Sequence, residues 1–227
     1  MKKLVTLAVT LLLPVAASAG NIANSKHDLS SLNTVATVRS TETNRICVFC
    51  HVPHNARSDI NGIWNRSDTA GTYDWGSVRT TIRGTYLSTT IGAGSERCFS
   101  CHDGTLGLGV LANSRSYAMT GAGEIDGTGQ ITNTCYIVND GAMAGNHPVS
   151  VPYPGQGATG TYNGVNSGTL NASYATVATA TGGTDGVKLY EDGSGNDWGI
   201  ECGSCHDPHG TGNSFFLRAS LTSSAIC

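Results

Sequence analysis

Three segments of the chain carry the same group of two cysteines and one histidine. They read CVFCH, CFSCH and CGSCH, and they start at positions 47, 98 and 202. Cysteines three positions apart, with a histidine directly after the second, share one face of a helical turn. Two thiols in that arrangement can bond the two vinyl groups of one porphyrin while the imidazole reaches its iron, as in c-type cytochromes. The expected attachment residues are Cys47, Cys50, Cys98, Cys101, Cys202 and Cys205, and the expected proximal iron ligands are His51, His102 and His206.

Two other chemistries use paired cysteines. Paired C-x-x-C segments hold structural zinc, and cysteines of exported proteins commonly form disulfides. Neither chemistry requires a histidine directly after every pair. Three such histidines therefore favour covalently bound haem c.

The other four histidines are candidates for the opposite, distal face of a haem. His54 and His209 each lie in an H-x-P-H segment directly after a haem motif, where the proline stiffens the exit from the attachment turn. His147 lies beside a proline in GNHPVS, and His27 lies in NSKHDLS. We expect all four to be distal ligands rather than solvated side chains, although the sequence does not pair them with particular haems.

The counts of histidine and cysteine bear on the last residue, Cys227. Seven histidines are one short of the eight that four haems with two histidines each require. We therefore expect Cys227 to open a fourth C-x-x-C-H motif and to be a further haem-attachment residue, so that the chain is truncated within that motif and its continuation supplies the eighth histidine. Cys135 is then a lone thiol that packs as a small apolar group. The alternative is a three-haem protein with a disulfide between Cys135 and Cys227.

The N-terminal segment, residues 1–19, has the pattern of a secretory signal peptide. Lys2 and Lys3 precede a short apolar run, and Ala17-Ser18-Ala19 is a typical cleavage site. The chain is therefore expected to be exported, with residues 20–227 forming a single domain. The formal net charge is −3 without any basic cluster, which argues against nucleic-acid binding. No later segment is apolar enough to predict a membrane span.

The composition offers little material for an ordinary hydrophobic core. Glycine accounts for 30 residues, aromatic residues for 7% of the chain, and no segment has a long helical period. Residues 120–130 and 155–169 are rich in small and polar residues typical of loops. The expected fold is mostly irregular coil with short helices and few strands, wrapped around a stacked chain of c-type haems that fills its interior.

The sequences around the motifs resemble those of a known family. RICVFCHVPHNA, ERCFSCHDGTLG, GNHPVS and IECGSCHDPHGTGNSFFLRAS are similar to the multihaem cytochromes of metal-reducing bacteria that carry doubled C-x-x-C-H motifs, in particular to tetrahaem surface cytochromes that form extracellular filaments. The resemblance implies closely stacked haems with two histidine ligands each, identical subunits as partners, and one distal histidine supplied by the next subunit. We expect His27, on an N-terminal arm, to be that histidine.

These expectations together predict electron transfer rather than catalysis. An iron with two imidazole ligands has no open position for a substrate, and it moves one electron with little rearrangement. The expected role is that of a subunit in an extracellular filament for long-range electron transport. Such a filament exchanges electrons with other multihaem cytochromes or extracellular acceptors. The alternatives are a monomeric periplasmic shuttle and a multihaem reductase with one open haem.

Overall fold

The computed structural model describes a large part of the chain. The described residues are 22–60, 62–67, 73, 91–134, 146, 149–152, 161–162, 165–166, 190–191, 198–210, 212–218 and 221. The predicted signal peptide (1–19), the predicted distal ligand His147, and both Cys135 and Cys227 lie outside them.

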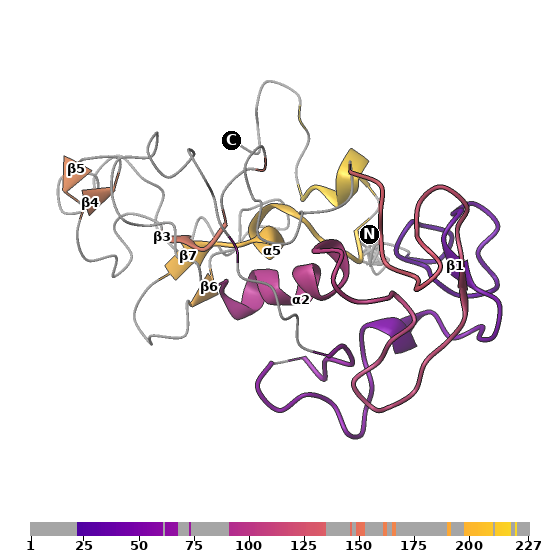
Figure 1. Ribbon diagram of the computed structural model, residues 1–227. Helices are drawn as coiled ribbons and strands as arrows, with labels where there is room; N and C mark the ends of the chain where they lie inside the picture. Colours follow the sequence, from indigo (N-terminus) through magenta and orange to yellow (C-terminus); the bar gives the residue numbers. More distant parts are fainter. Residues whose placement is uncertain are drawn as a thin grey trace, which may run out of the picture.

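The described helices are short, and three of the four coincide with the haem motifs. The 3-10 helix η1 covers Cys47–Phe49, α2 covers Ala93–His102, and α5 covers Cys202–Cys205, while a second 3-10 helix, η2, covers Ser214–Phe216. The helices α2 and α5 pack against each other in the middle of the molecule (Figure 1). Each motif therefore forms a helical turn as predicted, although the first is a 3-10 turn and not an α-helical one.

The described strands are two or three residues long and pair only antiparallel. Strand β1 (Arg39–Ser40) pairs with β2 (Met119–Thr120), and β4 (Thr161–Tyr162) pairs with β5 (Val165–Asn166). A three-stranded sheet has the order β3 (Val151–Pro152), β7 (Trp198–Ile200) and β6 (Tyr190–Glu191). Strand β7 ends two residues before α5, so this sheet leads the chain into the third motif.

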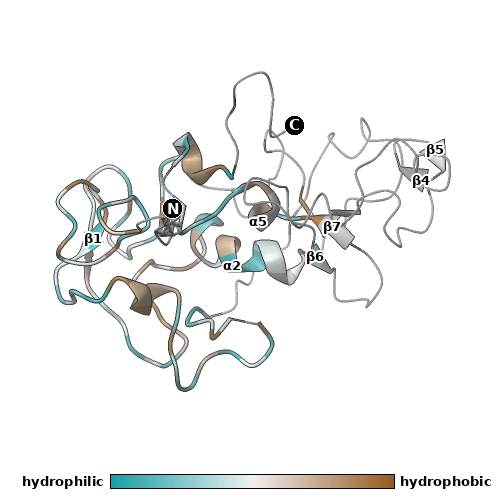
Figure 2. Ribbon diagram, turned by 180° about the vertical axis from the view of Figure 1, so that it is seen from behind, coloured by the Kyte–Doolittle hydropathy of each residue, from teal (hydrophilic) through white to brown (hydrophobic). Residues whose placement is uncertain are grey.

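The main apolar cluster is small and includes haem-motif residues. Leu29, Phe49, Leu108 and Leu111 are buried together, and both Cys50 and Cys101 pack against them. Figure 2 shows short hydrophobic stretches separated by hydrophilic ones along the described ribbon. Two of the predicted attachment cysteines, Cys50 and Cys101, thus lie where an ordinary protein would place core side chains.

The irregular architecture of the described residues is compatible with the expected fold, and its wrapping around haems remains a prediction. No described helix is both long enough and apolar enough to span a membrane.

Candidate haem-binding site

The proximal histidines of the first and third motifs are held in the same way. Nδ1 of His51 lies 2.8 Å from the carbonyl oxygen of Gly62, and Nδ1 of His206 lies 2.8 Å from that of Phe215. A carbonyl oxygen only accepts, so Nδ1 must carry the proton in each ring. In the neutral ring, Nε2 is then the nitrogen with a free lone pair, which is the form that binds a metal.

Unusual backbone conformations present these two carbonyl groups. Residues 62–63 have φ angles of 92° and 52°, and residues 215–216 both have φ of 58°. Three of these four residues are not glycine, so the left-handed conformation carries a local cost that the surroundings must offset. The next residue in each case, Trp64 or Leu217, forms an isolated β-bridge back to the motif histidine.

A further backbone contact extends the similarity between these two motifs. The Asn65 N–H donates to the Cys50 carbonyl at 2.9 Å, and the Arg218 N–H donates to the Cys205 carbonyl, also at 2.9 Å. The first and third motifs, each with its following loop, are therefore structural repeats. His54 and His209 occupy equivalent positions in the two repeats, three residues after the proximal histidine.

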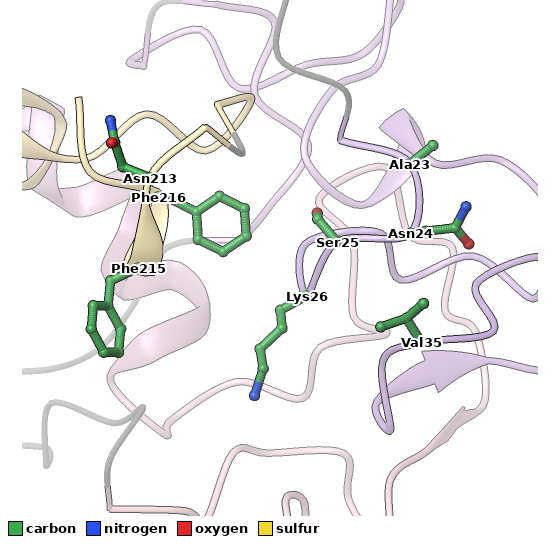
Figure 3. A pocket seen from close by; sticks show the side chains of 8 residues that line it. All are labelled: Ala23, Asn24, Ser25, Lys26, Val35, Asn213, Phe215 and Phe216. Carbon is green, nitrogen blue, oxygen red and sulfur yellow. The ribbon is translucent and has the colours of Figure 1, made fainter. Parts of the chain in front are cut away.

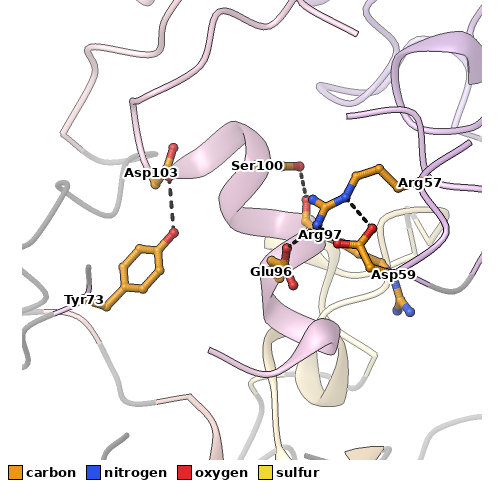
Figure 4. Close-up of polar contacts among 7 residues, drawn as sticks. All are labelled: Arg57, Asp59, Tyr73, Glu96, Arg97, Ser100 and Asp103. Atoms are coloured by element: carbon orange, nitrogen blue, oxygen red, sulfur yellow. Dashed lines mark hydrogen bonds and ion pairs between the residues drawn. The ribbon is translucent and has the colours of Figure 1, made fainter. Parts of the chain in front are cut away.

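Polar contacts at both ends of α2 position the second motif (Figure 4). Arg57, in the loop after the first motif, donates to Glu96 in the first turn of α2 at 2.9 Å and to Asp59. The bonds from Asp59 and Glu96 raise the pKa of Arg57, and Arg57 in turn lowers the pKa of Asp59. At the other end, the buried Asp103 accepts a hydrogen bond of 3.3 Å from the Tyr73 hydroxyl.

Hydrogen bonds around a buried carboxylate connect the second motif to the third. Glu201 is 2% exposed and accepts a short hydrogen bond from the Ser95 hydroxyl of α2, and that hydroxyl accepts the Cys202 N–H at 2.9 Å. Close by, the thiols of Cys98 and Cys202 are hydrogen-bonded to each other. This contact raises the pKa of Cys98 and lowers that of Cys202. The first cysteines of the two motifs therefore touch.

The first motif meets the second through their other cysteines. Burial, together with the nearby Cys101, raises the pKa of the Cys50 thiol to about 12. Since Cys50 and Cys101 also pack on the same apolar cluster, the two attachment turns lie against each other. The second motif thus contacts the first on one side and the third on the other.

His27, far from the motifs in sequence, lies against the second motif. Its ring centre is 6.1 Å from that of His102, with an interplanar angle of 77°. It stacks on Phe216 at 4.3 Å, and its Nδ1 lies 3.4 Å from the Pro208 carbonyl oxygen. Burial and then the proximity of His102 lower the pKa of His27 to about 4. The ring is therefore neutral at physiological pH, as a metal ligand must be.

His209 of the third repeat lies opposite His51 of the first. The two ring centres are 6.1 Å apart, and the rings are nearly parallel, with an interplanar angle of 21°. Trp64 lies beside the same His51 ring, with a centre-to-centre distance of 5.6 Å.

Both histidine separations match those of two imidazoles on one metal ion. A metal–imidazole bond is about 2.0 Å and the ring centre lies about 1.2 Å beyond the nitrogen, so two opposed rings have centres about 6.4 Å apart. The ring planes can rotate about the common axis, so angles of 77° and 21° are both compatible with this arrangement. The separations of the His27–His102 and His51–His209 rings are therefore compatible with one iron for each pair.

The remaining predicted ligands do not form such pairs among the described residues. His54 is exposed and makes no hydrogen bond or ring contact with any other described residue. His206 lies near enough to His27 to lower the pKa of that ring. Cys47 is exposed, and Cys205 is partly buried beside its motif partner.

Two further observations test whether a haem fits these residues. Trp64 is only 8% exposed, yet its Nε1–H has no hydrogen-bond partner among the described residues, as expected if the acceptor is a haem carboxylate beside His51. A pocket of about 430 Å³ is lined in part by Phe216, on which the His27 ring stacks (Figure 3). Its lining residues are Ala23, Asn24, Ser25, Lys26, Val35, Asn213, Phe215 and Phe216.

No group of three or more histidine, cysteine or acidic side chains is placed to hold a metal ion within the described ranges. A haem iron takes four of its ligands from the porphyrin, so two histidines are sufficient for it. The residues present fit haem c.

Several residues that shape the site escape prediction from sequence. Trp64, Arg66 and Glu201 are buried around the motifs, and Phe215 supplies the carbonyl for His206. Only Glu201 could have been noticed in the sequence, because it directly precedes the third motif. The contacts of the other three residues depend on how the loops fold back onto the motifs.

No protein-family model matches the chain, and a comparison with curated proteins gives no match.

Proposed function

We propose that the chain binds haem c covalently at its three complete motifs and transfers electrons between these haems. The observation that carries this proposal is the pair of 6.1 Å histidine separations, each joining a motif histidine to a histidine from a distant segment. These pairs bring the predicted distal ligands His27 and His209 to the predicted proximal ligands His102 and His51.

The protein residues then have a positioning role. When bound, the haem iron supplies one-electron redox chemistry. The Gly62 and Phe215 carbonyls fix the tautomer and ring orientation of His51 and His206. A second imidazole on the opposite face leaves no position for a substrate, which supports an electron carrier over an enzyme. Because Cys98 contacts Cys202 and Cys50 lies beside Cys101, haems attached there would be close neighbours.

The same geometry supports assembly of identical subunits. His209 of the third repeat faces His51 of the first repeat within one chain. His54 is the equivalent of His209 in the first repeat, and His206 is the equivalent of His51 in the third. The exposed His54 is therefore the distal histidine that we propose meets a haem of the neighbouring subunit. A head-to-tail contact of this kind generates an open filament.

This assignment replaces the expectation that His27 crosses to the next subunit. His27 lies against His102 of its own chain, so it is engaged within the subunit, whereas His54 is exposed. The filament is proposed to lie outside the cell and to exchange electrons with other multihaem cytochromes or extracellular acceptors.

Electron microscopy of the native protein sheared from the cell surface tests this proposal. We expect filaments with a regular repeat and continuous haem density, in which His54 meets the neighbouring subunit. A His54→Ala variant should retain its haems and remain as single chains. Isolated particles of the unaltered protein would instead indicate a periplasmic shuttle, and a carbon-monoxide-binding haem within intact filaments would indicate a reductase.

A further inference from the structure

Arg66 is a permanent positive charge enclosed in the protein. It is 0% exposed, and all five of its N–H groups donate to backbone carbonyls. Nε and Nη2 share the Ser100 carbonyl at 3.2 and 2.7 Å, Nη2 also reaches Gly107 at 3.2 Å, and Nη1 reaches Leu108 and Val110 at 2.6 and 2.9 Å. These five bonds saturate the guanidinium, and none of them goes to a carboxylate. Burying a charge in this way is costly, so its retention calls for a role.

Arg66 and its neighbour Asn65 join the first haem motif to the second. The Asn65 N–H donates to Cys50 at 2.9 Å, and its side-chain amide donates to the Val48 carbonyl at 2.6 Å, both in the first motif. Arg66 bonds the Ser100 carbonyl, which lies directly before Cys101 in the second motif. The guanidinium therefore lies between the attachment points predicted for two neighbouring haems.

The third motif has an arginine whose charge is balanced. Arg218 donates to the Gly203 carbonyl at 2.9 Å, and it also forms an ion pair with Asp207 at 3.3 Å. The carboxylate of Asp207 offsets the charge of Arg218, whereas the bonds of Arg66 include no negative partner. The two structural repeats thus differ in the charge next to their haem motifs.

We propose that Arg66 tunes the redox properties of the cytochrome, raising the reduction potentials of the haems at the first and second motifs relative to the haem at the third. Reduction adds one electron to an iron and moves no atoms, so a fixed positive charge nearby stabilises the reduced form. A unit charge about 10 Å from another, at an effective dielectric constant of about 20, changes an equilibrium constant roughly tenfold. Because the charge is enclosed, salt screens this effect only weakly. The inference rests on the proposed haem attachment.

Two variants at position 66 separate charge from geometry. Arg66→Lys and Arg66→Gln both remove the guanidinium and its five hydrogen bonds, but only Arg66→Gln removes the positive charge. In a spectroelectrochemical titration of the haem-loaded protein, we expect Arg66→Gln to lower the potentials of two haems by about 59 mV, a tenfold change in the equilibrium constant for one electron. Arg66→Lys should stay near the unaltered protein. Arg115→Gln is the matched control, because it removes the same charge from an exposed position and should leave all potentials unchanged.

The outcomes separate this inference from the proposed function. The covalent haem content, measured by mass spectrometry, comes first, and a chain without haem refutes the proposed function itself. Unchanged potentials in Arg66→Gln, or equal shifts in Arg66→Gln and Arg66→Lys, overturn the tuning role. If the position-66 variants do not retain haem, the tuning role is tested instead by the order in which the three haems of the unaltered protein are reduced. The third-motif haem should be reduced last of the three, and any other order overturns the inference.

Discussion

The two H-x-P-H segments offer a matched pair of substitutions, His209→Ala and His54→Ala. The sequence makes His54 and His209 equivalent, since each lies three residues after a proximal histidine and directly after a proline. The structure separates them. His209 faces His51 across 6.1 Å within the chain, while His54 is exposed without a described partner. Loss of His209 should therefore open one face of the first haem, and loss of His54 should open no haem within an isolated chain.

The size of the effect follows from the geometry. Removing His209 takes away one of the two imidazoles that we propose share a single iron, on the basis of their 6.1 Å separation, so one haem per chain should change from low spin to high spin. The assay is carbon monoxide titration of the reduced protein, performed on single chains separated by gel filtration. His209→Ala should bind one more carbon monoxide per chain than the unaltered protein, and His54→Ala should bind the same amount. Added imidazole should reverse the change in His209→Ala.

Three results would refute this reasoning. If His209→Ala keeps every haem low-spin, then His209 is not the distal ligand of the first haem. If His54→Ala opens a haem in single chains, His54 is a ligand within its own chain and the filament assignment is wrong. If external imidazole does not restore the low-spin spectrum, the substitution has disturbed more than one ligand.

Three further predictions follow from the contacts between motifs. A Cys98→Ala/Cys101→Ala variant should lose one haem and also its resistance to proteolysis, because the proposed haems would fill much of the protein interior. A compact variant that still resists proteolysis would contradict this prediction. Gly94→Val should lower the melting temperature, at a cost of about 1–3 kcal/mol, since even its Cβ would lie 3.0 Å from Cβ and Cγ of Glu201. Burial and the nearby His102 lower the pKa of His27 below its ordinary value of 6.5, and a bond to iron would lower it further, so its contribution to stability is present above pH 6.5 and lost as the pH falls below that value. Urea unfolding at several pH values should show a smaller loss for His27→Gln.

The haem motifs are the part of this protein that is most readable from sequence. The chemistry of C-x-x-C-H is local, because one helical turn brings two thiols and an imidazole to the same face. The three motifs do form helical turns, at η1, α2 and α5. The irregular character of the described chain could also be anticipated, from its many glycines and the lack of a helical period.

The pairing of histidines could not be predicted in this way. His27 meets His102 and His51 meets His209 across 75 and 158 positions of sequence, and no local pattern specifies which distant loop returns to which motif. For the same reason the sequence could not show that the His27 ring lies against His102 and Phe216 of its own chain.

By itself, then, the sequence determined which residues are candidates to attach haem and which histidines are candidate ligands, because these depend on residue type and on spacing within one turn. Only the tertiary structure decided which of these histidines lie close together and which remain at the surface. It also decided that Arg66 lies unbalanced between two motifs while Arg218 is paired with Asp207. The physical reason is that ligand pairing and charge compensation are set by distances between segments remote in sequence, and those distances exist only after the loops have folded back onto the motifs.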